Sequence, residues 1–82
     1  MKNVHYSNMD LYTIRLMEEV RQGRMTRTQA YYRIVGYQAA HEDLGVRLPI
    51  GSKVFALCNE DTDQVEWNVL LADLITYSEE VA

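Results

Sequence analysis

Cys58 is the one cysteine of the chain, and a thiol can act as a nucleophile where a base lies beside it. His41 could serve as that base, but no third group that would orient it and no glycine-rich oxyanion turn is evident. A small cysteine within the apolar run from Phe55 to Cys58 usually packs in a core. We therefore predict a buried thiol and no enzyme activity, with a reactive Cys58 as a rival hypothesis.

Three acids, Glu60, Asp61 and Asp63, precede a predicted helix and suggest a cation site. Their spacing lacks the glycine and the distal glutamate of an EF-hand loop, whereas carboxylates at a helix N-terminus are favoured by the helix dipole. His5, His41 and Cys58 are too few and too scattered for a structural zinc site, and no phosphate-binding loop is present. We predict that the acids cap the helix, and that the chain has no metal and no cofactor.

Arginine and tyrosine are concentrated in the first half of the chain, and both are enriched at protein interfaces. The residues that we predict to contact a partner are Arg27, Tyr31, Tyr32, Arg33 and Trp67. Adjacent side chains diverge by about 100° on a helix, so at least one ring of the Tyr31-Tyr32 pair should be exposed.

Charge is distributed unevenly along the chain. Residues 1–41 carry a net charge of +3 and residues 42–82 a net charge of −7, for a total of −4. Such asymmetry can steer an encounter with a charged partner or a second copy. Nucleic-acid binding by the basic N-terminal half is the alternative, since arginine and tyrosine can also clamp phosphates and stack on bases. The acidic total charge and the lack of a helix-turn-helix pattern oppose it.

Two long helices must position these side chains. The first is predicted from about Met9 to Gln22, capped by Ser7 or Asn8, with Asp10 in its first turn and Gly23 as its left-handed stop. Thr26 and Gln29 match a capping box, which predicts a second helix of about 18 residues that begins at Arg27. The sequence Leu44-Gly45-Val46 predicts its end, with Pro49 beyond it, and Gly36 in its interior suggests the close approach of another helix backbone.

The second half predicts a short element and a third long helix. Residues 52–59 suit a buried strand or a short helix, and we prefer a helix capped by Ser52, because a lone strand would have no partner. Residues 65–78 predict a helix that is apolar around most of its circumference. One side of that helix holds Trp67, Leu70, Leu71, Leu74 and Tyr77, and the neighbouring stripe holds Val65, Val69, Ala72 and Ile75.

We conclude that residues 1–82 form a single all-α domain, a small helical bundle of three long helices plus one short helical segment. With no disulfide and no metal to brace so small a core, a protein partner or a homodimer should cover part of its apolar surface. A lone thiol and the lack of a signal peptide or a membrane span favour the cytoplasm. We interpret the chain as a small non-enzymatic regulator or accessory factor of the inhibitor or adaptor type, which a phage or mobile element could encode. We predict that it binds its partner through the tyrosine- and arginine-rich second helix and the apolar C-terminal helix.

Overall fold

The computed structural model describes residues 4–81, and the side chains of residues 9–79. Its four helices are α1 (Val4–Arg21), α2 (Arg27–Asp43), α3 (Ser52–Cys58) and α4 (Gln64–Val81), and the described residues contain no strand. The predicted class, a small all-α bundle of three long helices and one short one, is confirmed. None of these helices is long and apolar enough to cross a membrane.

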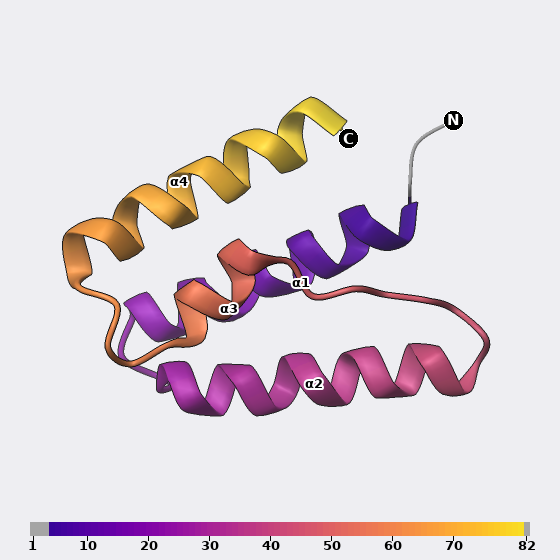
Figure 1. Cartoon of the computed structure of the whole chain (residues 1–82). Coiled ribbons are helices and arrows are strands. Elements are labelled where there is room, and N and C mark those ends of the chain that lie inside the picture. Colours follow the sequence, from indigo (N-terminus) through magenta and orange to yellow (C-terminus); the bar gives the residue numbers. More distant parts are fainter. Residues whose placement is uncertain (1–3, 82) are drawn as a thin grey trace.

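The helices form three levels. α1 lies in the middle and packs against both α2 and α4, while α3 lies across the front and contacts all three long helices (Figure 1). α2 and α4 do not pack against each other along their lengths, and they are linked by the side chain of Arg27 at the start of α2, which reaches Gln64 and Trp67 of α4. Their outer faces therefore point to opposite sides of the molecule.

α1 begins earlier than the sequence predicts. The backbone is helical from Val4, so the expectation that Ser7 or Asn8 caps a helix at residue 9 is wrong, and the side chains of both lie outside the described residues. Serine and asparagine are also tolerated inside helices, and residues 4–8 hold no proline or glycine that would delay the start. The predicted stop is confirmed, since Gly23 has a φ of +78°.

Both ends of α2 follow the local prediction. The Thr26 hydroxyl accepts from the Gln29 amide at 3.0 Å, and the Thr26 amide donates to the Gln29 side chain at 2.9 Å, which completes the capping box. At the other end Gly45 has a φ of +82°, and the Val46 amide donates to the His41 carbonyl at 2.9 Å, as in a Schellman motif.

The predicted role of Gly36 is wrong within this chain. Gly36 is exposed, and a Cβ added there would meet no atom within 4 Å. No other helix of the described chain approaches the α2 backbone at this position.

The segment at residues 52–58 is the preferred short helix, but Ser52 does not cap it. The N-cap residue is Gly51, which has no side chain to accept a capping hydrogen bond, and Ser52 is the first helical residue. A helix of only seven residues buries one face, formed by Val54, Leu57 and Cys58.

The acidic cluster serves helix ends. Asp63 accepts from the Glu66 amide at 2.8 Å at the start of α4, as the sequence predicts. Glu60 instead accepts from the amide and the hydroxyl of Thr28, both at 3.0 Å, and so supports the first turn of α2. The described residues hold no cluster of acids, histidines and cysteine that could bind a metal ion.

The core lies between the three levels. Its buried apolar residues come from all four helices and from the loop before α3: Met9, Leu16, Met17, Ala30, Ile34, Leu48, Val54, Leu57, Cys58, Trp67, Leu71 and Leu74. Between α1 and α2 the rings of Tyr12 and Tyr37 stack with centroids 3.9 Å apart. Two of the six tyrosines therefore join these helices and are not surface contacts.

Candidate protein-binding surface

Three aromatic rings from two helices meet on one side of the molecule. The ring centroid of Tyr31 lies 6.0 Å from that of Tyr32, in an edge-to-face arrangement, and 6.1 Å from that of Phe55 on α3. Tyr32 is 69% exposed and Phe55 47% exposed, while Tyr31 is half-buried between them. We call these three residues the aromatic surface. It confirms that at least one ring of the tyrosine pair is exposed.

The α2 backbone next to the aromatic surface is uncovered. Gly36 and Ala39 lie four and seven residues after Tyr32, so the three share one outward face of the helix. Val35 and Ala40 are exposed beside them, and residues 34–41 contain no aspartate, glutamate, lysine or arginine. Residues 34–41 thus present a strip of small, uncharged side chains on the outer face of α2, with the ring of Tyr32 at one end. Such a strip suits close contact with another chain.

Two of the predicted contact residues, Arg27 and Trp67, belong to the fold instead. Trp67 is only 1% exposed, and its indole Nε1 donates to the Leu57 carbonyl at 3.0 Å, which ties α4 to the end of α3. The Arg27 guanidinium lies 5.4 Å from the centre of the Trp67 ring and donates to the carbonyl of Asn59 at 2.9 Å. The structure thus brings the two together, but as a clamp between α2 and the loop before α4. Trp67 is not available to a partner, because tertiary packing, which the sequence pattern does not reveal, buries it.

Arg33 lies away from the aromatic rings. Its side chain is exposed and makes no hydrogen bond with the described residues, and its charge contributes to the lowered pKa of Glu19 on α1, which the hydrogen bond from Arg24 lowers most. Arg33 therefore borders the strip on the α1 side, whereas Tyr31 borders it on the α3 side. Of the five predicted contact residues, Tyr31 and Tyr32 lie at the candidate surface and Arg33 lies at its edge.

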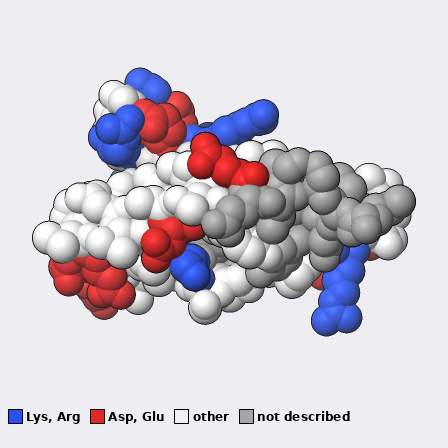
Figure 2. Space-filling view, turned by 90° about the horizontal axis from the view of Figure 1, so that it is seen from above, with Lys and Arg blue, Asp and Glu red and all other residues white. Residues whose placement is uncertain are grey.

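A second uncovered apolar area runs along the outer face of α4. Val65 is 74% exposed and Val69 55% exposed, and Ala72 and Thr76 continue the same face one and two turns later. Figure 2 looks onto the α4 side and shows uncharged atoms over much of the described surface, with acidic and basic side chains among and around them. The sequence predicts a helix that is central to the core, or half core and half interface, and in the structure α4 has one buried side and one exposed side. Because α4 and α2 face opposite ways, one partner helix cannot cover both areas.

Two of the five arginines in residues 9–41 form ion pairs. Arg21 bonds Glu18 at 2.7 Å, and Arg24 bonds Glu19 at 2.8 Å. The hydrogen bond from Arg21 lowers the pKa of Glu18, so this carboxylate stays charged. With Arg27 held in the clamp, Arg15 and Arg33 are left as the exposed arginines outside these contacts in the described part of α1 and α2.

The candidate nucleophile and base do not meet. The Asn59 carbonyl, next to Cys58, accepts from Arg27 in the first turn of α2, whereas His41 lies 14 residues further along that helix, about 20 Å by the helical rise. His41 Nδ1 instead contacts the Tyr37 carbonyl at 2.8 Å. Burial raises the pKa of the Cys58 thiol to about 11, so the thiol is protonated at neutral pH.

Sequence reasoning misses Phe55 as part of the surface. The apolar run from Phe55 to Cys58 predicts only that the cysteine is buried. The helix of about two turns that it forms turns Val54, Leu57 and Cys58 inward and leaves Phe55 exposed. The exposed ring becomes recognisable once the segment is known to be helical, because Phe55 follows Val54 by one residue and must diverge from it. Comparisons of the chain with protein-family models, curated proteins and solved structures found no match.

Proposed function

We propose that the chain is a small non-enzymatic regulator or accessory factor that binds another protein through the aromatic surface and the adjoining strip of α2. The observation that carries this proposal is the exposure of Tyr32, at 69%, beside the rings of Tyr31 and Phe55. Isolated exposed apolar residues are ordinary, but a cluster of rings next to uncharged helix backbone is the composition of an interface centre.

The shape of the strip indicates a helix as the partner element. Gly36 leaves open space where any other residue would place a Cβ, so a second backbone can approach α2 there. The ring of Tyr32 stands one turn before this gap and can pack along the side of the incoming helix. Tyrosine is enriched among the residues that dominate binding energies, and its removal at an interface centre costs about 2 kcal/mol or more.

A second copy of the chain is one partner that the same surface can accept. In an antiparallel pair of α2 helices centred on Gly36, Tyr32 of one copy faces Ala40 of the other. No two charged side chains of like sign are opposed within residues 34–41, since the segment contains none. Sedimentation velocity over a range of concentrations separates the two cases. The fraction of homodimer rises with protein concentration, whereas a chain that binds only a foreign partner stays monomeric at every concentration.

Nucleic-acid binding, the alternative, gains little support. Arg21 and Arg24 are paired with glutamates and Arg27 is held by carbonyl groups, so neutralisation of several phosphates would require these bonds to break. We expect no mobility shift of double-stranded or single-stranded DNA even at low salt. A shift that weakens steeply as salt rises would favour the alternative.

The test of the proposal compares two substitutions of exposed apolar residues on opposite sides of the molecule. Tyr32→Ser removes the exposed ring of the aromatic surface, and Val65→Ser removes the 74% exposed side chain at the start of α4. Both positions are on the surface, so both variants should keep the stability of the parent within about 0.5 kcal/mol. The binding assay is recovery of partner protein on each tagged variant from the source cell, followed by titration of the purified pair.

We expect Tyr32→Ser to weaken binding by about 30-fold and Val65→Ser to leave it unchanged. Equal binding by Tyr32→Ser and the parent contradicts the proposal. A loss confined to Val65→Ser assigns the interface to the outer face of α4.

A further inference from the structure

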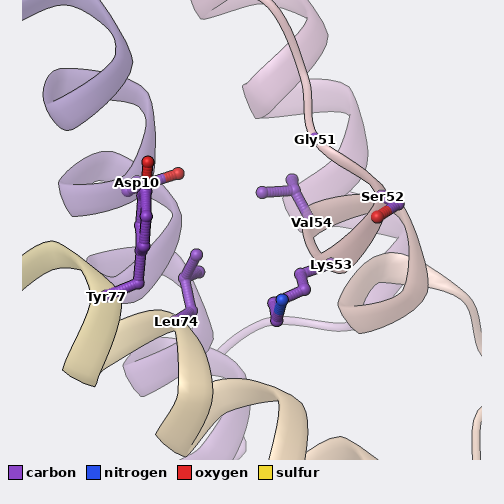
Figure 3. A pocket seen from close by; sticks show the side chains of 7 residues that line it. All are labelled: Asp10, Gly51, Ser52, Lys53, Val54, Leu74 and Tyr77. Atoms are coloured by element: carbon purple, nitrogen blue, oxygen red, sulfur yellow. The ribbon is translucent and has the colours of Figure 1, made fainter. Parts of the chain in front are cut away.

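A pocket of about 190 Å³ lies between α1, α3 and α4, on the side of the bundle away from the outer face of α2 (Figure 3). Its volume somewhat exceeds that of cavities that hold a benzene molecule, about 150 Å³. It therefore admits a small molecule of roughly six to ten non-hydrogen atoms. The proposed protein-binding surface does not include any residue of this pocket.

The inner end of the pocket holds a buried acid with an unused acceptor. Asp10 is 5% exposed, and its Oδ2 atom is buried and has no hydrogen-bond partner. A buried acceptor without a partner is costly, and a carboxylate more so. Oδ2 is closed to solvent in this conformation, so a donor of a ligand bonds to it only after the carboxyl group rotates towards the pocket that Asp10 lines. Burial raises the pKa of Asp10, and the positive charge of Lys53 lowers it in part.

Apolar side chains form the walls. Val54 is 1% exposed and points from α3 towards Asp10, and Leu74 of α4 is 4% exposed (Figure 3). Tyr77 of α4 also lines the pocket. An alkyl chain fits against this lining.

The outer end of the pocket carries the opposite charge. Lys53 and Ser52 are exposed at the start of α3, and neither makes a hydrogen bond or an ion pair with the described residues. Lys53 and Asp10 do not form an ion pair with each other, although the pocket places them on facing walls. The pocket thus offers an acceptor inside, donors outside and apolar walls between them.

We propose that this pocket binds a small amino acid zwitterion, with its ammonium group at Asp10 and its carboxylate at Lys53 and Ser52. A ligand with both charges satisfies the groups that the protein leaves unpaired, whereas an amine alone leaves Lys53 beside an added positive charge. Asp10 and Lys53 line the same pocket without forming an ion pair, and Val54 and Leu74 supply its apolar walls. This arrangement favours a ligand whose two charged groups stand at opposite ends of a short alkyl chain. γ-Aminobutyrate has this form, and its isomer α-aminobutyrate has both groups on one carbon.

The experiment is an NMR titration of the full chain with these two isomers, and with butylamine and butanoate, each of which carries one of the two charges. The amides of Gly51, Val54 and Leu74 line the pocket and report binding. We expect saturable shifts with γ-aminobutyrate, with a dissociation constant on the order of 1 mM for so small a ligand. The α isomer and the two singly charged compounds should bind about tenfold more weakly or not at all.

Variants separate the pocket from general charge effects. Asp10→Asn keeps the size of the side chain but removes the charge, and Lys53→Met removes the outer cation at an exposed position where folding is not at risk. Each should weaken binding of γ-aminobutyrate by about tenfold, whereas Asp43→Asn, an exposed acid outside the pocket, should not change it.

Three results overturn the proposal: no saturable shift at the three amides with either isomer, equal binding of butylamine and γ-aminobutyrate, or unchanged binding by Asp10→Asn. Each is distinct from the test of the aromatic surface, because Tyr32→Ser does not touch the pocket.

Discussion

Replacement of Gly36 by alanine and replacement of Gly45 by alanine should change the stability of the protein in opposite directions. Gly36 lies inside α2 with no positive φ, and a Cβ there meets nothing within 4 Å. Glycine in a helix interior costs about 0.5 to 1 kcal/mol relative to alanine, through the greater backbone freedom of the unfolded chain. Gly36→Ala should therefore stabilise the isolated protein by about that amount.

Gly45→Ala provides the matched control. Gly45 has a φ of +82°, where a Cβ crowds the backbone although no other atom lies near it. The left-handed conformation costs an alanine about 1 to 2 kcal/mol, so this variant should be destabilised. For a domain of this size, 1 kcal/mol corresponds to a shift in Tm of about 4 to 8 °C.

The assay is thermal unfolding followed by circular dichroism, with urea unfolding to give the free energy. We expect Tm to rise for Gly36→Ala and to fall for Gly45→Ala. A fall in Tm for Gly36→Ala would refute the reasoning, because it would require crowding at a position that the structure shows to be open. The added methyl group should at the same time weaken partner binding, so that stability and affinity change in opposite directions.

Three further predictions concern the interior. Trp67→Phe removes the hydrogen bond to the Leu57 carbonyl and should lower the free energy of unfolding by about 1 to 3 kcal/mol in urea, and an unchanged midpoint would show that this bond is not formed. Arg27→Met should cost about 1 to 2 kcal/mol in the same assay, against less than about 0.5 for Arg33→Met, and equal effects would contradict the clamp. The folded-state pKa of Cys58 is raised from 9.0 to about 11, so the protonated thiol is the form that stabilises the fold, and this contribution is lost as pH rises through that window. At pH 8 iodoacetamide should alkylate folded Cys58 about 100-fold more slowly than the urea-unfolded chain, and similar rates would point to a reactive thiol.

The helix ends show which parts of the fold can be predicted from the sequence. The capping box at Thr26 and the left-handed stops at Gly23 and Gly45 depend on a few adjacent residues, and all three predictions are confirmed. Ser7 and Ser52 were expected to cap helices on the same kind of evidence, but α1 begins at Val4 and α3 is capped by Gly51. A single cap residue favours the start of a helix but does not force the helix to begin there. A single serine is therefore a weaker signal than a capping box, in which two residues bond each other's backbone amides.

The candidate site was only partly predictable for a related reason. Tyr32 is exposed because adjacent residues of a helix cannot both face the core, which is a local rule. The burial of Trp67, the exposure of Phe55 and the position of Asp10 at the end of a pocket depend on how helices distant in sequence pack together. Periodicity identifies the apolar side of α4 and gives no information about which neighbour covers it.

Site-specific photo-crosslinking tests the central claim, that the aromatic surface is where a partner binds, most directly. Benzoylphenylalanine is placed singly at Tyr32, at Val65 on the outer face of α4, and at Arg47 in the loop before α3, all exposed positions. Irradiation in the source cell should give a discrete crosslinked species from position 32 and only background from position 47. No product at position 32, or the same products from all three positions, would contradict the claim.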